Sequence, residues 1–252
     1  MRKEALLIVL MLLFSCAPPQ AAEPQKQGMP SKISDVPAQP LFDPADQDTP
    51  GWTQTSGPLG GTVIRMIPHD GTIWASLYSG GIYKLENNAW KQIAVGYGIP
   101  EVRAFDILPN PTNKNIAYVP EMIACGAKTI NNGASWHGLC DKMLKDIDAD
   151  NFNSHTLAFD PDDQNILYVP GHDHLGTSML LISKDAGQHW EKPHIFDAHH
   201  DFNHIFFFGN NMYLTTTDSG VFVSADKGRT WKAKNDGLED TKTARLVAFK
   251  NR

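Results

Sequence analysis

The stretch Ser224-Ala-Asp-Lys-Gly-Arg-Thr-Trp231 has the residues of a tight turn between two strands, and it recurs as Ser183-Lys-Asp-Ala-Gly-Gln-His-Trp190. A third copy, Thr129-Ile-Asn-Asn-Gly-Ala-Ser-Trp136, has Asn in place of Asp at the third position. A carboxylate or amide at the third position accepts backbone N–H groups of its own turn. Gly two residues later supplies the positive φ of a tight hairpin, and Trp begins the returning strand with a large apolar ring. The sequence therefore predicts three β-hairpins of one design.

The third, fifth and eighth positions of each copy are the expected structural residues. They are Asn131, Gly133 and Trp136 in one copy, Asp185, Gly187 and Trp190 in the next, and Asp226, Gly228 and Trp231 in the last. The pattern resembles the Asp-box, or BNR, repeat of β-propeller proteins such as sialidases, sortilin-type receptors, xyloglucanases and photosystem II assembly-factor propellers. The resemblance implies a propeller, but it implies no chemistry, because the motif closes a hairpin at the blade edge.

Spacing along the chain agrees with a propeller. From Trp52 onward short β-rich runs alternate with turn residues, and no amphipathic helical stretch is apparent. Trp residues fall at 90, 136, 190 and 231, at intervals close to the 40–50 residues of a propeller blade. We predict an all-β propeller of four-stranded antiparallel blades. The expected blades span about 61–94, 101–138, 154–193 and 203–235, with a lone strand at 52–55 and a partial blade at 244–252. This count indicates either a fragment of a larger propeller or an imperfectly closed ring.

The N-terminal segment predicts export. Arg2 and Lys3 precede an apolar run from Ala5 to Phe14, which is too short to span a bilayer but fits a signal peptide over residues 1–15. Leu13-Phe14-Ser15-Cys16 resembles a lipobox, which implies lipidation of Cys16. Ala at position 17 then implies transfer to the bacterial outer membrane, facing the periplasm or the surface. The alternative is an ordinary signal peptide cleaved near Ala21-Ala22.

Composition limits the partners. Residues 16–50 are rich in Pro, Gln, Ala and Asp and indicate a disordered tether, followed by the propeller over 51–252. Without residues 1–15, 20 Lys and Arg face 27 Asp and Glu, a net charge of −7. This charge argues against nucleic acid as a partner. Cys125 and Cys140 are expected to form a disulfide in an oxidising compartment, the alternative being two buried thiols.

Superposing the repeats predicts a ring of polar residues at the start of the inner strands. Counting back from Pro109 and Pro161 gives Arg103 and His155, and counting back from the second-strand aromatic residues Trp74 and Tyr213 gives Arg65 and His204. The terminal strand continues the same register with Arg245. Cationic and titratable groups at the mouth of a central channel would bind an anionic ligand. The alternative is a channel mouth lined by any long polar side chains because it is wet.

Histidines in two loops predict a second site. His172 and His174 are expected in a loop of the third blade, and His199, His200 and Asp201 in the loop that follows it. Imidazoles with a carboxylate suit zinc or another late transition metal, but the spacing matches no established motif, so the cofactor stays unknown beyond a candidate divalent metal.

The acidic segment 141–153 holds Asp146, Asp148 and Asp150 but lacks the Gly and Glu of a calcium loop. We interpret it as a solvated loop.

Two functions remain after these observations. We favour a lipid-anchored, non-catalytic binding or scaffold module for an anionic glycan, peptide or protein partner, which it contacts through the channel-mouth face. The alternative is a sialidase-like glycoside hydrolase, or a remnant of one, because Arg65, Arg103 and Arg245 resemble the three arginines that sialidases use to hold a carboxylate. We assign no catalytic residue, since no nucleophile pair or acid is identifiable.

Overall fold

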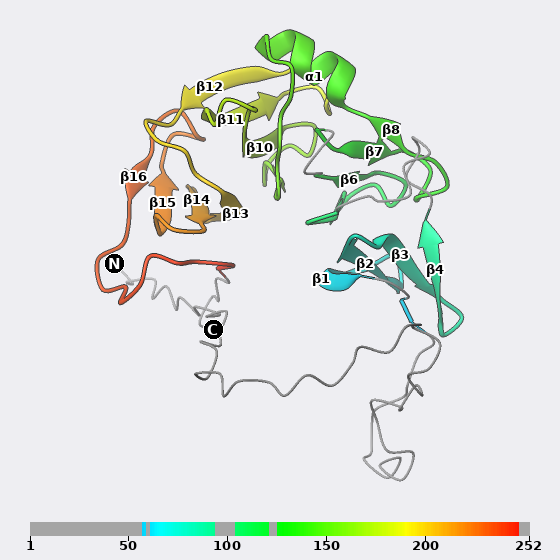
Figure 1. The fold of residues 1–252 in the computed structure, drawn as a ribbon. Coiled ribbons are helices and arrows are strands. Elements are labelled where there is room, and N and C mark those ends of the chain that lie inside the picture. Colours follow the sequence, from blue (N-terminus) through cyan, green and yellow to red (C-terminus); the bar gives the residue numbers. More distant parts are fainter. Residues whose placement is uncertain (1–56, 59–60, 94–103, 121–124, 247–252) are drawn as a thin grey trace, which may run out of the picture. The chain divides into compact units, whose positions relative to one another are not determined.

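The computed structural model describes residues 57–58, 61–93, 104–120 and 125–246. These residues form four antiparallel four-stranded sheets, arranged in a ring as a four-bladed β-propeller (Figure 1). Each sheet uses four consecutive strands in chain order, so every blade is a meander. The predicted fold class is therefore confirmed. The predicted signal peptide and tether, Cys16, Arg103 and the strand at 52–55 lie outside the described residues.

The strand bounds follow the chain. The first blade consists of β1 (Thr62–His69), β2 (Thr72–Tyr78), β3 (Gly81–Glu86) and β4 (Ala89–Ile93). The second consists of β5 (Leu108–Pro109), β6 (Ala117–Val119), β7 (Ala127–Thr129) and β8 (His137–Gly138). The third consists of β9 (Ala158–Phe159), β10 (Leu167–His172), β11 (Ser178–Ser183) and β12 (Glu191–Ile195). The fourth consists of β13 (Phe202–Phe208), β14 (Asn211–Thr216), β15 (Val221–Ser224) and β16 (Lys232–Ala233).

Apolar side chains fill the space between consecutive blades. Trp74 of the first blade packs edge-on against Trp136 of the second, with ring centroids 6.4 Å apart. Leu180 of the third blade and Met212 of the fourth are both fully buried in one cluster. A further cluster joins the second blade to the third. The core of this fold is thus a series of interfaces between blades, because a single sheet cannot bury its own faces.

The three predicted turns, hereafter the repeat turns (129–136, 183–190 and 224–231), share one hydrogen-bond pattern. In the last, Ser224 Oγ donates to Asp226 Oδ1 at 2.8 Å and accepts the backbone N–H of Gly228 at 2.8 Å. Asp226 Oδ1 also accepts the N–H of Thr230 at 2.9 Å. Equivalent contacts come from Ser183 and Asp185, and from Thr129 and Asn131.

Backbone conformation adds one feature that the sequence did not predict. The residue before each repeat-turn glycine also has positive φ, 54° at Lys227 before 86° at Gly228. Asn132 and Ala186 occupy the same position in the other two repeat turns. The first blade lacks this turn, but Asn87 and Asn88 both have positive φ there. Two consecutive residues of positive φ make the twisted hairpin turn that joins antiparallel strands.

Each repeat turn also packs on the preceding blade. A Cβ atom added at Gly228 would lie 2.2 Å from Leu180 Cδ2 of the third blade. In the repeat turn of the third blade, the carbonyl of Ala186 accepts a hydrogen bond from Tyr118 Oη of the second blade at 3.0 Å. The repeat turns therefore close their own hairpins and hold neighbouring blades together.

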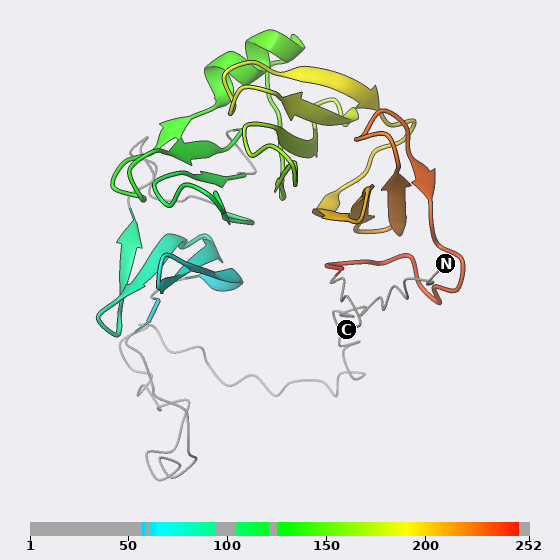
Figure 2. The ribbon, with the colours of Figure 1, turned by 180° about the vertical axis from the view of Figure 1, so that it is seen from behind.

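One helix departs from the all-strand expectation. α1 spans Cys140–Ile147 on the outer rim of the ring (Figures 1 and 2) and buries Met143 and Ile147. The interpretation of residues 141–153 as a solvated loop was therefore wrong for this part. Asp146 Oδ2 accepts the backbone N–H of Trp190 at 2.9 Å, so its carboxylate joins the helix to the third blade. Eight residues are too few for a clear helical period, so the helix could not be predicted from apolar periodicity.

None of the helices among the described residues is sufficiently long and apolar to span a bilayer.

Candidate functional site

The strand ladders fix which inner-strand residues are equivalent. In the first blade Trp74 pairs with Ile67, and Arg65 lies two residues before Ile67. In the fourth blade Tyr213 pairs with Phe206, and His204 lies two residues before Phe206. The same count in the second and third blades leads to Asp106 and Thr156, because Leu108 faces Tyr118 and Ala158 faces Tyr168. The equivalent positions thus hold Arg65, Asp106, Thr156 and His204, in that order.

This register corrects the alignment that placed Arg103 and His155 in the ring. Asn110 and Asp160 are the equivalent residues, since each donates its backbone N–H across the hairpin, to Ile116 and Ile166 respectively. Pro111 therefore corresponds to Pro161. Counting back from Pro109 starts two residues too early and so leads to Arg103. His155 lies one residue before the ring position.

Asp106 is the residue that sequence reasoning missed. Its side chain is fully buried, and its Oδ1 forms an ion pair with Arg65 and accepts the N–H of Ile107 at 2.7 Å. Its Oδ2 lies 3.5 Å from Arg245 Nη2. Arg65 of the first blade and Arg245, which follows the fourth blade, thus both contact the carboxylate of Asp106 in the second blade. We call Arg65, Asp106, His204 and Arg245 the arginine cluster.

Positive charge in the arginine cluster comes from the arginines alone. Burial, followed by the nearby charges of Arg245 and Arg65, lowers the pKa of His204 to about 3, so its ring is neutral at pH 7. The pKa of Arg245 is lowered, and burial is the largest cause. The charge of Asp106 raises this pKa, and the charge of Arg65 lowers it. Two guanidinium groups therefore face one carboxylate, and a positive charge remains uncompensated among these groups. The imidazole of His204 therefore adds no positive charge to the cluster at pH 7.

His155 lies close by in a different setting. Its ring stacks on Phe105, with centroids 4.1 Å apart, and its Nε2 has no hydrogen-bond partner among the described residues. Burial lowers the pKa of His155, against a smaller opposing effect of Asp201. His155, Asn153, His172 and Asp201 line a pocket between the third and fourth blades. Burial therefore favours the neutral ring, which lines one pocket together with His172 and Asp201 of the second predicted site.

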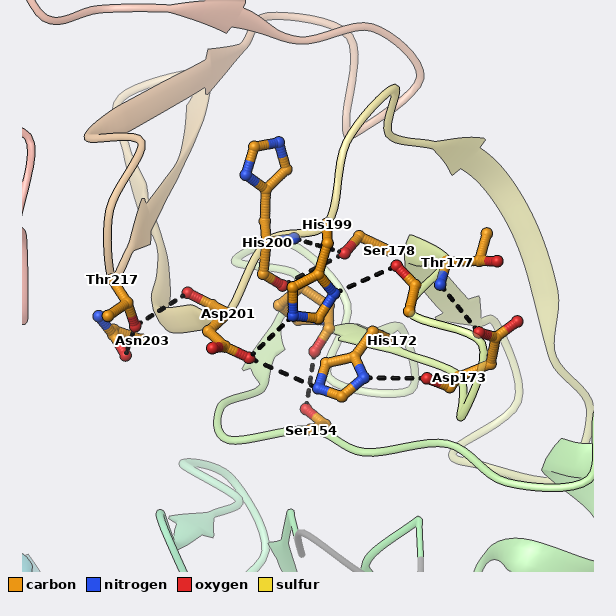
Figure 3. Close-up of polar contacts among 12 residues, drawn as sticks. Ser154, His172, Asp173, Thr177, Ser178, His199, His200, Asp201, Asn203 and Thr217 are labelled. Atoms are coloured by element: carbon orange, nitrogen blue, oxygen red, sulfur yellow. Dashed lines mark hydrogen bonds and ion pairs between the residues drawn. The ribbon is translucent and has the colours of Figure 1, made fainter.

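Three of the five predicted metal-ligating residues come together. His172 Nε2 lies 3.5 Å from Asp201 Oδ1, and His199 Nε2 lies 3.6 Å from the same oxygen (Figure 3). The rings of His172 and His199 meet edge to face, with centroids 4.8 Å apart. We call these three residues the histidine cluster. His172 is the last residue of β10 rather than a loop residue.

The other two predicted ligands lie elsewhere. His174 is exposed and is not among the three residues that come together. The ring of His200 points away from His172 and His199 (Figure 3) and packs among Phe196, Phe202 and Phe222. The side chains of these adjacent residues point in different directions, and only His199 reaches the cluster (Figure 3).

The disulfide forms as expected. Cys125 and Cys140 are bonded, with Cα atoms 5.1 Å apart. The bond ties the first residue of α1 to the residues just before β7. It therefore anchors the helical insertion to the second blade.

Comparison with known proteins identifies the fold and no more. The chain matches no protein-family model and no curated protein. Among solved structures it is similar to an ancestral GH74 enzyme, with a TM-score of 0.55 and 18% identity over 70% of this chain and 25% of that one. The GH74 enzyme of Niastella koreensis has a TM-score of 0.55 and 18% identity over 69% of this chain and 30% of that one. The GH74 xyloglucanase of Xanthomonas campestris has a TM-score of 0.53 and 18% identity over 72% of this chain and 31% of that one. The chain thus spans between a quarter and a third of these propeller proteins.

Proposed function

We propose that this protein is a non-catalytic binding module that holds an anionic glycan, peptide or protein through the arginine cluster. The supporting observation is that Arg65 and Arg245 converge on a single buried carboxylate, Asp106. Two cations share one anion there, and each guanidinium carries five N–H donors in a planar fork. A ligand carboxylate, sulfate or phosphate can accept the donors that Asp106 does not engage.

Accessibility supports the same proposal. The side chains of Arg65 and Arg245 retain 20% and 32% of their exposure, whereas Asp106 is fully buried. A buried carboxylate holds the two guanidinium groups in place before any ligand arrives, which lowers the entropic cost of binding. A half-buried arginine also forms stronger charge-assisted contacts than one on the open surface.

A titration tests this proposal. Oligogalacturonate and sialyllactose are titrated into the purified protein by calorimetry, with a neutral xyloglucan oligosaccharide and an acidic peptide for comparison. Arg245→Gln should weaken binding of the anionic probe at least tenfold, as expected for the loss of a charge-assisted hydrogen bond. Arg229→Gln is the matched control, because Arg229 is exposed in a repeat turn and the charge change is identical. Equal weakening in both variants, or equal binding of the neutral probe, would contradict the proposal.

A hydrolase of the sialidase kind is the second candidate, favoured by the convergence of Arg65 and Arg245. Glycosidases use two carboxyl groups roughly 5–9.5 Å apart. Among the described residues, Asp106 is the one carboxylate in contact with these arginines, and both of its oxygens face guanidinium groups. This engagement favours a binding role. Release of fluorophore from a sialoside substrate, lost in Arg65→Ala, would support the hydrolase instead.

We further propose that the module is attached to the bacterial outer membrane through a lipid on Cys16. The proposal rests on the signal-like residues 1–15 and the tether-like composition of residues 16–50. Metabolic labelling with a palmitate analogue should label the wild-type protein and not Cys16→Ser. Labelling of both proteins, or of neither, would contradict it.

A further inference from the structure

We propose that the histidine cluster is a binding site for a divalent transition-metal ion, with Zn²⁺ as the preferred ion. His172 Nε2, His199 Nε2 and Asp201 Oδ1 would be the protein ligands. This inference goes beyond the proposed anion-binding function and does not depend on it, because none of the three residues belongs to the arginine cluster.

Distances in the cluster agree with a zinc site. The oxygen of Asp201 lies 3.5 Å and 3.6 Å from the two imidazole nitrogens, and all three atoms lie within 4.8 Å of one another. Tetrahedral zinc with bonds of about 2.1 Å separates its ligand atoms by about 3.4 Å. A small rotation of the rings would therefore bring all three atoms to bonding distance of one ion.

Hydrogen bonds on the far side of each ring orient the cluster toward a cation. His172 Nδ1 lies 3.0 Å from the carbonyl oxygen of Asp173, and His199 Nδ1 lies 3.1 Å from that of Gly176. A carbonyl oxygen only accepts, so each Nδ1 carries a hydrogen and each neutral ring has its lone pair on Nε2. Metal-binding histidines are typically held in this way.

The resulting arrangement concentrates electron density at one point. Two imidazole nitrogens and one carboxylate oxygen face each other, and all three are groups that zinc accepts as ligands. A bound metal ion satisfies all three groups at once.

Backbone contacts fix the ligands before metal arrives. Asp173 Oδ1 accepts the N–H groups of Leu175 and Thr177, at 2.9 Å and 2.8 Å, and so closes the turn that presents the Gly176 carbonyl. His200 lies between His199 and Asp201 in the sequence, and its backbone N–H donates a hydrogen bond to Ser178 Oγ at 2.7 Å. The carbonyl of Asp201 accepts the N–H of Thr217 at 2.9 Å. The two segments that carry the ligands are thus both restrained, as in designed metal sites.

Three protein ligands leave a fourth position on tetrahedral zinc. His199 and Asp201 keep about half of their side-chain exposure, 51% and 44%, so the ion can enter from solvent. His155 lines the same pocket as His172 and Asp201. Sites with three protein ligands and an open position bind exchangeable ligands.

Calorimetric titration of ZnCl₂ into EDTA-treated, dialysed protein tests the inference. We expect one ion per chain for the wild type and affinity at least 100-fold weaker for His172→Ala and for His199→Ala. His174→Ala is the matched control, because it removes an exposed histidine from the same turn and should leave affinity unchanged. Equal affinity in wild type and both ligand variants would overturn the inference, since it would show adventitious binding by surface histidines.

A second measurement guards against variants that lose structure. Asp201→Asn keeps the shape of the ligand but removes its charge. Zinc should raise the unfolding temperature of the wild type and of His174→Ala, and should raise that of Asp201→Asn much less. Circular dichroism before titration confirms that each variant is folded. No rise in the wild type, or an equal rise in all three proteins, would overturn the proposed site.

Discussion

The three repeat turns make the same hydrogen bonds in three blades, whereas the equivalent inner-strand positions hold four different residues, Arg65, Asp106, Thr156 and His204. Every hairpin has the same local need, because its turn must reverse the chain and contact the preceding blade. Inner positions from different blades face one another instead. Each can therefore take a different chemical part in one shared site.

This comparison separates stability from binding. Substitutions in the repeat turns should change the free energy of unfolding and leave ligand affinity intact in the folded protein. Substitutions at exposed ligand groups of the arginine and histidine clusters should do the reverse. Buried members of the inner face, such as His204, should affect stability through their protonation. The predictions below test these separations in order of expected effect.

Gly228→Ala should have the largest effect, a loss of about 2–4 kcal/mol in the free energy of unfolding. Alanine at positive φ costs about 1 kcal/mol, and overlap with a buried side chain costs about 1–3 more. Gly71→Ala is the matched control, because Gly71 has φ of 75° but open space around its Cβ position. It should lose only about 1 kcal/mol in urea unfolding. Equal losses would show that the contact with Leu180 contributes nothing.

Loss of the disulfide should destabilise the protein by roughly 3 kcal/mol, because the bond closes a loop over a sequence separation of 15. Urea unfolding of oxidised and reduced wild type measures this difference with no change of sequence. The insertion that contains α1 is absent from the other described blades, so the effect should be specific to the second blade. Amide exchange in α1 should accelerate on reduction. A uniform change of exchange across all blades would contradict this view.

Acid should destabilise the inner face first. The folded pKa of His204, about 3, lies below its ordinary value of 6.5, so its contribution to stability is complete above pH 6.5 and declines as the pH falls toward 3. His204→Gln should reduce the dependence of unfolding free energy on pH by up to about 1.4 kcal/mol per pH unit in that window. His174→Gln, at an exposed position, should leave the slope unchanged. Parallel profiles for wild type and His204→Gln would contradict the buried, neutral assignment.

Asp226→Asn should have the smallest effect at pH 7, because Asn131 makes the equivalent contacts in the second blade. Hydrogen bonds from the side chain and then the backbone of Thr230 lower the pKa of Asp226 to about 2. Since this value is below the ordinary 3.8, the contribution of Asp226 to stability is present above about pH 4 and lost as the pH falls to 2. The variant should therefore flatten only the most acidic part of the unfolding profile. A change between pH 5 and pH 7 would contradict the assignment.

Features that depend on local sequence were predictable. The repeat turns contain their own closing residues, and their spacing indicates the blades, so the fold could be predicted without any tertiary contact. The register could also have been found. Asn110-Pro111 and Asp160-Pro161 are the matching pairs, and alignment on Pro109 displaced the count.

Features that depend on contacts between blades were not predictable. Asp106 looks like an ordinary polar residue in the sequence, and its burial between Arg65 and Arg245 arises only when separate blades meet. His199 and His200 are chemically identical, yet backbone direction brings only the first to the histidine cluster. Three-dimensional arrangement therefore selected three of five predicted metal ligands.

The central claim is that repeat turns maintain the fold while the inner face binds an anion. Calorimetric titration of oligogalacturonate into wild type, Arg245→Gln and Asp226→Asn, each verified as folded at the temperature used, tests it most directly. We expect affinity at least tenfold weaker for Arg245→Gln and unchanged for Asp226→Asn. Equal affinity in wild type and Arg245→Gln, or equal weakening in both variants, would contradict it.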